Sequence, residues 1–455
     1  MVEPTGALHV VPVDELFFST TDAKGIIDLS NSVFTRMSRY SREQLRGAPH
    51  NLIRHPEMPG AAFKVMWDTL QSGEPFAAYV RNLAADGSEY RVFATITPLA
   101  DGGYLSVRSR PCDDSLYSAV SDIYAVVRKA EREAMAAGKN RREAAEIGVG
   151  VLVDTLHGAG IATYESFQNA ALVSEVALRE ARADGFPVRS GESALVSALD
   201  KARAVYEHFS SWMSTQEILS QMATDIAQTV KRVDEDMAYM AEVGQKFTLY
   251  GADRPELASL TMPLTVWVQM QGIVGGYMDS LSAKLDELTL NVSRTQFRIA
   301  LSRLHIYMYG HFVAEVLDFD EDDDSTYDQF RALVMLGEAL QDDIRTLRTQ
   351  TARTATFMQA VRDYVRQVAE AVAIPRQLLS LWETTADMTV RDSLGSELAA
   401  TVAGAKNRAD SSLRELEHFG NSVDKSDELY SEFSELDDLL GDMCEIVNAI
   451  VRSRR

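Results

Sequence analysis

Two kinds of hydrophobic pattern divide the chain near residue 112. Before that point, short runs of β-branched and aromatic residues are separated by turn signals such as Asp22–Gly25 and Asp86–Gly87. Such runs predict strands, and an Asp-Gly pair between two of them predicts a hairpin. Beyond residue 112 the apolar positions recur at helical spacing, so we expect an almost wholly helical region.

The N-terminal pattern predicts an antiparallel sheet with helices between its strands. Strand-turn-strand patterns occupy ELFFSTTDAKGIIDLSN and PFAAYVRNLAADGSEYRVFATITP, and GGYLSVRSRP predicts a further strand. Between them, Ser41 and Gly47 delimit a capped helical turn, and MPGAAFKVMWDTLQSG predicts a longer helix that ends at Gly73. This order of elements is similar to that of a PAS domain, an α+β fold in which a five-stranded antiparallel sheet and its helices enclose a pocket.

The remaining chain predicts long helices that pack along a seven-residue repeat. Apolar positions step by four and three residues in four stretches, which are Ile226–Met240, Leu281–Val316, Ile344–Val372 and Leu429–Ile450. A seven-residue period keeps one narrow stripe facing a partner helix, so we expect an all-α helical bundle or coiled coil. The partner helices are expected from the same chain or from a second copy. Glycines at 272–276 and Pro375 predict helix breaks.

These patterns predict six consecutive segments: a tail (1–13), a PAS-like sensor domain (14–112), a connector helix (113–137), a helical bundle or coiled-coil region (138–317), an acidic loop (318–328) and a C-terminal long-helix region (329–455). We expect the acidic loop to be solvated. Calcium binding is the alternative for this loop, which lacks the ligand spacing of an EF-hand.

The composition narrows the classes of function. The 455 residues carry a formal net charge of −22, which argues against nucleic-acid binding because phosphate contacts need clustered Lys and Arg. The two cysteines, Cys112 and Cys444, have no metal-type spacing and predict a reducing, cytoplasmic setting. The N-terminus has no signal-peptide pattern. The uncharged stretch Leu257–Met278 contains proline and glycines, so we expect a buried helix there and no membrane span.

No enzyme motif is present in the sequence. A phosphate-binding loop, a Gly-x-Ser-x-Gly elbow, a His-Glu-x-x-His helix and the histidine-kinase and diguanylate-cyclase signatures are all missing. His305 and His311 lie six positions apart and therefore on different faces of a helix, so we expect no metal site there. We therefore expect a non-enzymatic protein.

One short segment carries the strongest candidate chemistry. NLIRHPEMPG, from Asn51 to Gly60, concentrates Arg54, His55 and Glu57 between two prolines, directly before the longer helix. Arg and His donors suit an anionic ligand such as a pyrophosphate. Alternatively, the pair could cap the following helix or form buried hydrogen bonds with Glu57 as the ion partner.

The stretch NLIRHPEMPGAAFKVMWDTLQSGEPF and the later VRNLAADGSEYRVFATITP resemble the PAS domain of bacterial aerotaxis receptors and related energy-taxis transducers. The resemblance covers residues from about Asp14 to Arg110. It implies a flavoprotein in which FAD is bound non-covalently and reports redox state or oxygen. Carried over by position, the implied FAD-binding residues are Asn31, Arg54, His55, Glu57, Phe63, Phe76 and Asn82. The family usually has Trp at the positions of Phe76 and Arg91, and Asp at that of Glu57.

We therefore expect a bacterial cytoplasmic signal-transduction sensor of redox, oxygen or energy state, similar to an aerotaxis protein. Its PAS domain would pass a conformational change to the helix that begins near Asp113. The alternatives are an interaction scaffold with a ligand-free PAS pocket, and a pocket that binds haem, with His55 as axial ligand, or a small metabolite. We expect a homodimer formed through the PAS domain and the coiled-coil helices. The resemblance also implies chemotaxis kinase or adaptor partners, but the nearest match to a chemoreceptor signalling tip, Asn169–Phe186, is poor.

Overall fold

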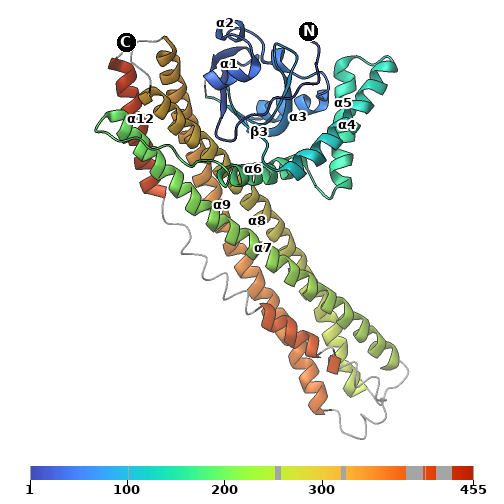
Figure 1. Cartoon of the computed structure of the whole chain (residues 1–455). Coiled ribbons are helices and arrows are strands. Elements are labelled where there is room, and N and C mark those ends of the chain that lie inside the picture. The colour runs from blue at the N-terminus through green and yellow to red at the C-terminus, as the bar shows by residue number, and fades with distance from the viewer. Residues whose placement is uncertain are drawn as a thin grey trace. The chain divides into compact units, whose positions relative to one another are not determined.

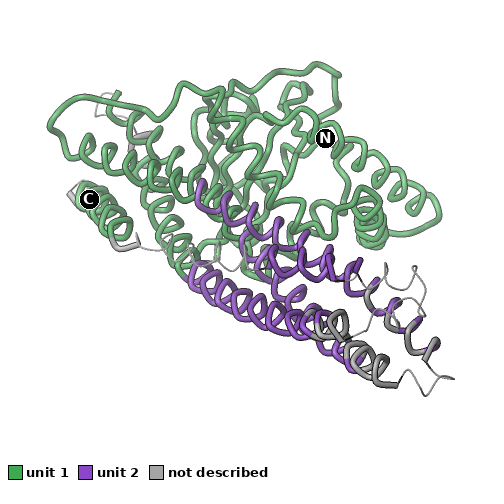
Figure 2. The backbone as a smooth tube through the Cα atoms, turned by 90° about the horizontal axis from the view of Figure 1, so that it is seen from below, with its two compact units in different colours: residues 1–213, 293–348, 432–455 green, residues 214–292, 349–431 purple. Residues whose placement is uncertain are grey.

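The computed structural model describes residues 2–100, 102–251, 258–318, 324–385, 403–404, 406–416 and 433–453. The chain forms two compact units (Figure 2). Unit 1 contains residues 1–213, 293–348 and 432–455, and unit 2 contains residues 214–292 and 349–431. Both units are discontinuous along the chain because three long helices each contribute to both, whereas the sequence predicts consecutive segments.

The N-terminal part of unit 1 contains the five-stranded antiparallel sheet that the sequence predicts (Figure 1). Its strand order is β2-β1-β5-β4-β3. The strands are β1 (Phe17–Thr21), β2 (Ile27–Ser30), β3 (Phe76–Leu83), β4 (Glu89–Pro98) and β5 (Tyr104–Ser109). Gly25 and Gly87 adopt φ angles of 77° and 82° in the two predicted turns, a conformation that glycine reaches without steric cost.

Four short elements follow β2 and precede β3. They are α1 (Ser32–Ser38), α2 (Arg42–Leu45), the 3-10 helix η1 (His50–Ile53) and α3 (Gly60–Gln71). The predicted cap at Ser41 is confirmed, since its side chain forms a capping box with Gln44. Together with α1, α2 and η1, one face of the sheet encloses a hydrophobic core. We call this face the inner face and the core the PAS interior; its members include Phe17, Phe34, Ile53, Tyr90, Val92 and Ala94.

The opposite, outer face of the sheet is also buried. Ala77, Tyr79 and Phe93 pack against α4 (Asp114–Ala136), α5 (Arg141–Gly158) and α6 (Tyr164–Glu180). In Figure 1, α4 and α5 form an antiparallel pair beside α3. A sheet buried on both faces can pass a change on its inner face to the helices that cover its outer face.

The long helices are α7 (Ala194–Gly251), α8 (Ala258–Asp318), α9 (Asp324–Thr385) and α12 (Phe433–Ser453). The seven-residue repeat is confirmed: every repeat position from Leu281 to Val316, and every one from Ile344 to Val372, is buried. In unit 2 the repeat positions of α7, α8 and α9 form one apolar core.

Two of the predicted helix breaks are wrong. Helix α8 continues through the glycines at 272–276, and α9 continues through Pro375. An interior glycine costs a helix about 1 kcal/mol and an interior proline about 3 kcal/mol. In helices of 61 and 62 residues, packing of the repeat positions offsets these costs. Of the acidic loop, residues 319–323 lie outside the described residues. Within the described part of the chain, no helix has both the length and the apolar character needed to cross a bilayer.

Candidate functional site

Asn31, the first of the seven resemblance-based residues, has a structural role at the start of α1. Its Oδ1 accepts hydrogen bonds from the backbone amides of Phe34 (3.1 Å) and Phe18 (3.0 Å), and its Nδ2 donates to the carbonyl of Leu16 (2.8 Å). The side chain therefore caps a helix and fastens it to the neighbouring strand. Both ends of the amide are occupied by the chain itself.

Arg54 points toward α3 and the α4–α5 pair. Its guanidinium carbon lies 3.6 Å from the centre of the Phe63 ring, and Nη2 donates to the carbonyl of Pro59 at 3.5 Å. Burial lowers the pKa of Arg54 to about 10, although the negative charge of Glu131 on α4 opposes this shift. Phe63 thus serves as the platform for a cation.

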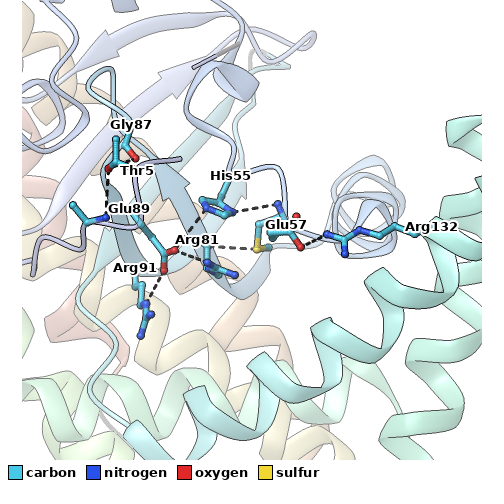
Figure 3. Close-up of polar contacts among 10 residues, drawn as sticks. Thr5, His55, Glu57, Arg81, Gly87, Glu89, Arg91 and Arg132 are labelled. Carbon is cyan, nitrogen blue, oxygen red and sulfur yellow. Dashed lines mark hydrogen bonds and ion pairs between the residues drawn. The ribbon is translucent and has the colours of Figure 1, made fainter. Parts of the chain in front are cut away.

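His55 is buried with both ring nitrogens facing partners (Figure 3). Its Nδ1 accepts the backbone amide of Glu57 at 3.2 Å, so Nε2 carries the proton and faces the Glu89 carboxylate at 3.7 Å. Burial, together with the charge of Arg81, lowers the pKa of His55 below its usual value. A neutral ring held in this way has no nitrogen free for the axial iron bond of the haem alternative.

The carboxylate of Glu89 is at the centre of a charged cluster beside His55 on the outer face of the sheet. Arg81 and Arg91 both donate to its carboxylate, the latter at 2.8 Å (Figure 3). Burial alone would raise the pKa of Glu89, but hydrogen bonds from these two arginines lower it below the usual value. The cluster connects His55 of the NLIRHPEMPG segment to strands β3 and β4 and lies outside the PAS interior.

The end of the NLIRHPEMPG segment is bound by one face of α4. The carboxylate of Glu131 accepts the backbone amides of Gly60 (2.9 Å) and Ala61 (2.8 Å), the first residues of α3. Neighbouring arginines on α4 make two more bonds: Arg128 donates to the carbonyl of Pro56 at 3.2 Å, and Arg132 donates to Glu57. Glu131 is 2% exposed. A buried carboxylate from α4 thus caps the free amides and the positive dipole end of α3.

Phe76 lies at the beginning of β3, away from the Arg-His pair. Its ring stacks on that of Tyr164 from α6, with the centroids 5.3 Å apart and the planes 3° from parallel. The hydroxyl of Tyr164 donates to the carbonyl of Ala77 at 3.1 Å. Phe76 is therefore one of the contacts between the sheet and α6.

Asn82 differs from the other six residues because its Nδ2 is buried without a hydrogen-bond partner among the described residues. Two more polar atoms on the inner face share this condition, the hydroxyl of Tyr90 and Nη1 of Arg108. Asn82 and Tyr90 are opposite each other in the β3–β4 ladder. All three side chains are at most 4% exposed. Buried polar groups in folded proteins nearly always have partners, so these three groups are candidates to bind a ligand.

Arg108 is also a buried cation without a carboxylate partner among the described residues. Its Nη2 donates to Ser19 Oγ at 3.0 Å and to Nε2 of His50, and its guanidinium carbon lies 5.1 Å from the centre of the Phe34 ring. Because Arg can only donate, His50 accepts at Nε2 and is neutral. Burial lowers the pKa of Arg108 to about 10 and, together with the charge of Arg108, lowers that of His50 well below its usual value.

A second buried carboxylate connects the sheet to the helices. Glu175 on α6 accepts the hydroxyl of Tyr79 at 2.7 Å and the backbone amides of Cys112 (2.6 Å) and Asp113 (3.0 Å). Burial raises the pKa of Glu175 above its usual value. The contact joins the outer face of β3 to the residue that caps α4.

The comparison with protein families agrees with this fold. Residues 27–107 match a family model described as the PAS fold. The N-terminal domain is a PAS domain. The PAS resemblance and the predicted fold class are thereby confirmed, with a large helical region following the domain.

The match to the aerotaxis receptor lies in the PAS region. The aerotaxis receptor of Escherichia coli (strain K12) is 40% identical over 115 residues, which cover 24% of this chain and 22% of the receptor. The nitrogen fixation regulatory protein of Klebsiella pneumoniae is 35% identical over 81 residues, or 18% of this chain and 16% of that protein. The chain thus spans about a fifth of the length of these curated relatives. A light-state structure of the blue-light photoreceptor Aureochrome1 LOV aligns with 23% of this chain and 89% of its own, at 21% identity and a TM-score of 0.22.

The structure brings the seven resemblance-based residues together only in part: Arg54 contacts Phe63 and its backbone bridges Asn82, whereas Asn31 and Phe76 make separate contacts. Only Asn82 has an unpaired group in the PAS interior, and its companions there, Tyr90 and Arg108, were not among the candidates. Strand alternation gives a signal for Arg108, since it shares a face with Tyr104 and Ser106 in a largely buried strand. No comparable signal marks Glu131 or Glu175.

Proposed function

We propose that this chain is a signal-transduction sensor whose PAS interior binds a flavin, with FAD as the form that the resemblance implies. The observation that carries the proposal is the set of unpaired buried groups of Asn82, Tyr90 and Arg108 on the inner face. A flavin offers a flat aromatic ring with hydrogen-bonding atoms along one edge, so it needs both donors and ring contacts.

The surrounding side chains fit such a group. The Phe17 and Tyr90 rings stack 5.7 Å apart, and Phe34 and His50 stack at 5.8 Å. A bound flavin would supply a redox-active ring, while Asn82, Tyr90 and Arg108 would hold its polar edge. Since these rings pack against one another, a ligand that enters between them rearranges the side chains, and this rearrangement is the signal that we propose.

Two carboxylates provide the route out of the PAS domain. Glu131 ties the first turn of α3 to α4, and Glu175 ties Tyr79 of the sheet to the start of α4. Buried hydrogen-bonded contacts of this kind favour switching between discrete arrangements. In our proposal, a change in the PAS interior shifts these contacts and thereby moves the α4–α6 helices.

The wider predictions belong to the same proposal. We propose sensing of redox, oxygen or energy state without enzymatic activity, in the cytoplasm and in a homodimer. Chemotaxis kinase or adaptor partners are proposed from the resemblance to the aerotaxis receptor, which is matched over 22% of its length.

The test is the absorption spectrum of the purified full chain, before and after incubation with FAD. We expect flavin bands in the wild type, and at least tenfold weaker FAD binding in Asn82→Leu and Tyr90→Phe, which would correspond to about 1.4 kcal/mol or more. Arg91→Gln, on the outer face, is the matched control and should keep wild-type binding. A Soret band would indicate that the PAS interior binds haem instead of flavin. A colourless protein that takes up neither cofactor would favour the interaction scaffold.

A further inference from the structure

Arg108 is an unusual residue for the inner face of a sheet. Its relative exposure is 4%, and among the described residues no carboxylate pairs with it. Its contacts are the neutral groups Ser19, His50 and Phe34, and no residue that the structure describes is a partner of Nη1. A buried charge is costly unless it is paired, so a charge retained here needs a compensating one.

The neighbouring groups do not provide that charge. The closest titratable groups are His50 and Tyr90; His50 accepts from Arg108 and is neutral, and burial raises the pKa of Tyr90 above its usual value, so its hydroxyl stays protonated. On the other packed elements, the side chains that face Arg108 are Ser19 of β1 and Phe34 of α1, neither of which is charged. None of the described residues that face Arg108 thus supplies a compensating negative charge.

We propose that Arg108 is an anion-binding residue of the PAS interior, and that it favours the reduced, negatively charged state of the flavin over the neutral oxidised state. This inference rests on the proposed function. A fixed positive charge beside a flavin ring stabilises added electron density and so raises the reduction potential. Arg108 would thereby determine at which ambient potential the sensor changes state.

The experiment is a reductive titration of the FAD-loaded full chain with dithionite and indicator dyes. Arg108→Gln removes the charge and keeps a donor, whereas Arg108→Lys keeps the charge. We expect the preference for reduced over oxidised flavin to be at least tenfold weaker in Arg108→Gln than in the wild type. This change lowers the two-electron midpoint potential by about 30 mV or more. Arg108→Lys should retain most of the wild-type potential, and Arg91→Gln all of it.

A second readout does not need the flavin. In the flavin-free protein, an uncompensated charge destabilises the fold, so Arg108→Met should unfold at the wild-type temperature or above it. A structural arginine would give the opposite result, with a lower unfolding temperature in Arg108→Met and an unchanged potential in flavin-loaded Arg108→Gln. That pair of results would overturn the inference and leave the proposed function intact. A wild-type protein that binds no FAD would overturn both.

Discussion

Glu131 offers the sharpest test of how the PAS domain is connected to the helices. Its carboxylate accepts two backbone amides, at 2.9 Å from Gly60 and 2.8 Å from Ala61, and Arg128 donates to it at 3.3 Å. The first amides of a helix have no partner within the helix. Replacing Glu131 with Ala therefore leaves two buried donors unpaired and removes a favourable charge at the positive end of α3.

The magnitude follows from these bonds. A hydrogen bond to a charged group contributes about 1.5–3 kcal/mol, and a buried unpaired donor costs about 1–3 kcal/mol. After water enters to replace part of the loss, we expect Glu131→Ala to destabilise the contact between α3 and α4 by about 3 kcal/mol. Glu131→Gln keeps one acceptor and loses the charge, so we expect about 1–2 kcal/mol.

Hydrogen–deuterium exchange of the full chain measures this contact locally, without assuming two-state unfolding of a protein with two units. Peptides that contain the Gly60 and Ala61 amides should exchange about 100-fold faster in Glu131→Ala and about tenfold faster in Glu131→Gln. Glu133→Ala, at an exposed position of the same helix, is the matched control. Wild-type exchange rates in Glu131→Ala would refute the idea that this carboxylate holds α4 on α3.

Three further outcomes are expected. A Cβ at Gly148 would lie 2.7 Å from a carboxylate oxygen of α4, so Gly148→Ala should lower the urea midpoint through a loss of about 1–3 kcal/mol of stability. Gly150→Ala, whose Cβ meets nothing within 4 Å, should raise the midpoint through a gain of up to about 1 kcal/mol. Shifts of the two midpoints in the same direction would contradict the packing. Glu57→Gln breaks the exposed ion pair with Arg132, which contributes at most about 1 kcal/mol, and should leave the FAD content unchanged. Loss of FAD in this variant would indicate that Glu57 binds the ligand. Burial raises the pKa of Glu175 above its usual 4.5, so this group stabilises the fold most below pH 4.5 and less as pH rises through the folded pKa. The melting temperature of the wild type relative to that of Glu175→Gln should therefore fall from about pH 4 to about pH 7. A difference that stays constant with pH would be inconsistent with the burial.

The fold was predictable because its signals are local. Alternation with period two marks each strand, and the seven-residue repeat marks the long helices, so both patterns can be read within one element. The helix breaks at 272–276 and at Pro375 were mispredicted for a related reason. A local breaker signal carries no information on how much packing the rest of the helix contributes.

The candidate site was predictable only in part. Asn82 was found by resemblance, but the unpaired state of its amide depends on what the neighbouring strands place beside it. Arg108 could have been found from strand alternation, which puts a charged residue on a buried face. Glu131 and Glu175 could not, because their partners lie 70 and 96 residues away and no local pattern specifies such contacts.

The NLIRHPEMPG segment is better explained by docking than by ligand binding. Arg128, Glu131 and Arg132 lie three and four positions apart, so they share one face of α4. That face bonds the carbonyl of Pro56, the side chain of Glu57 and the first two amides of α3. A ligand-binding segment would leave donors unpaired, whereas here every one of these polar groups is paired with α4. Asn82, Tyr90 and Arg108, each with an unpaired buried atom, lie instead on the inner face of the sheet, so the proposed ligand site and the docking surface of this PAS domain are separate.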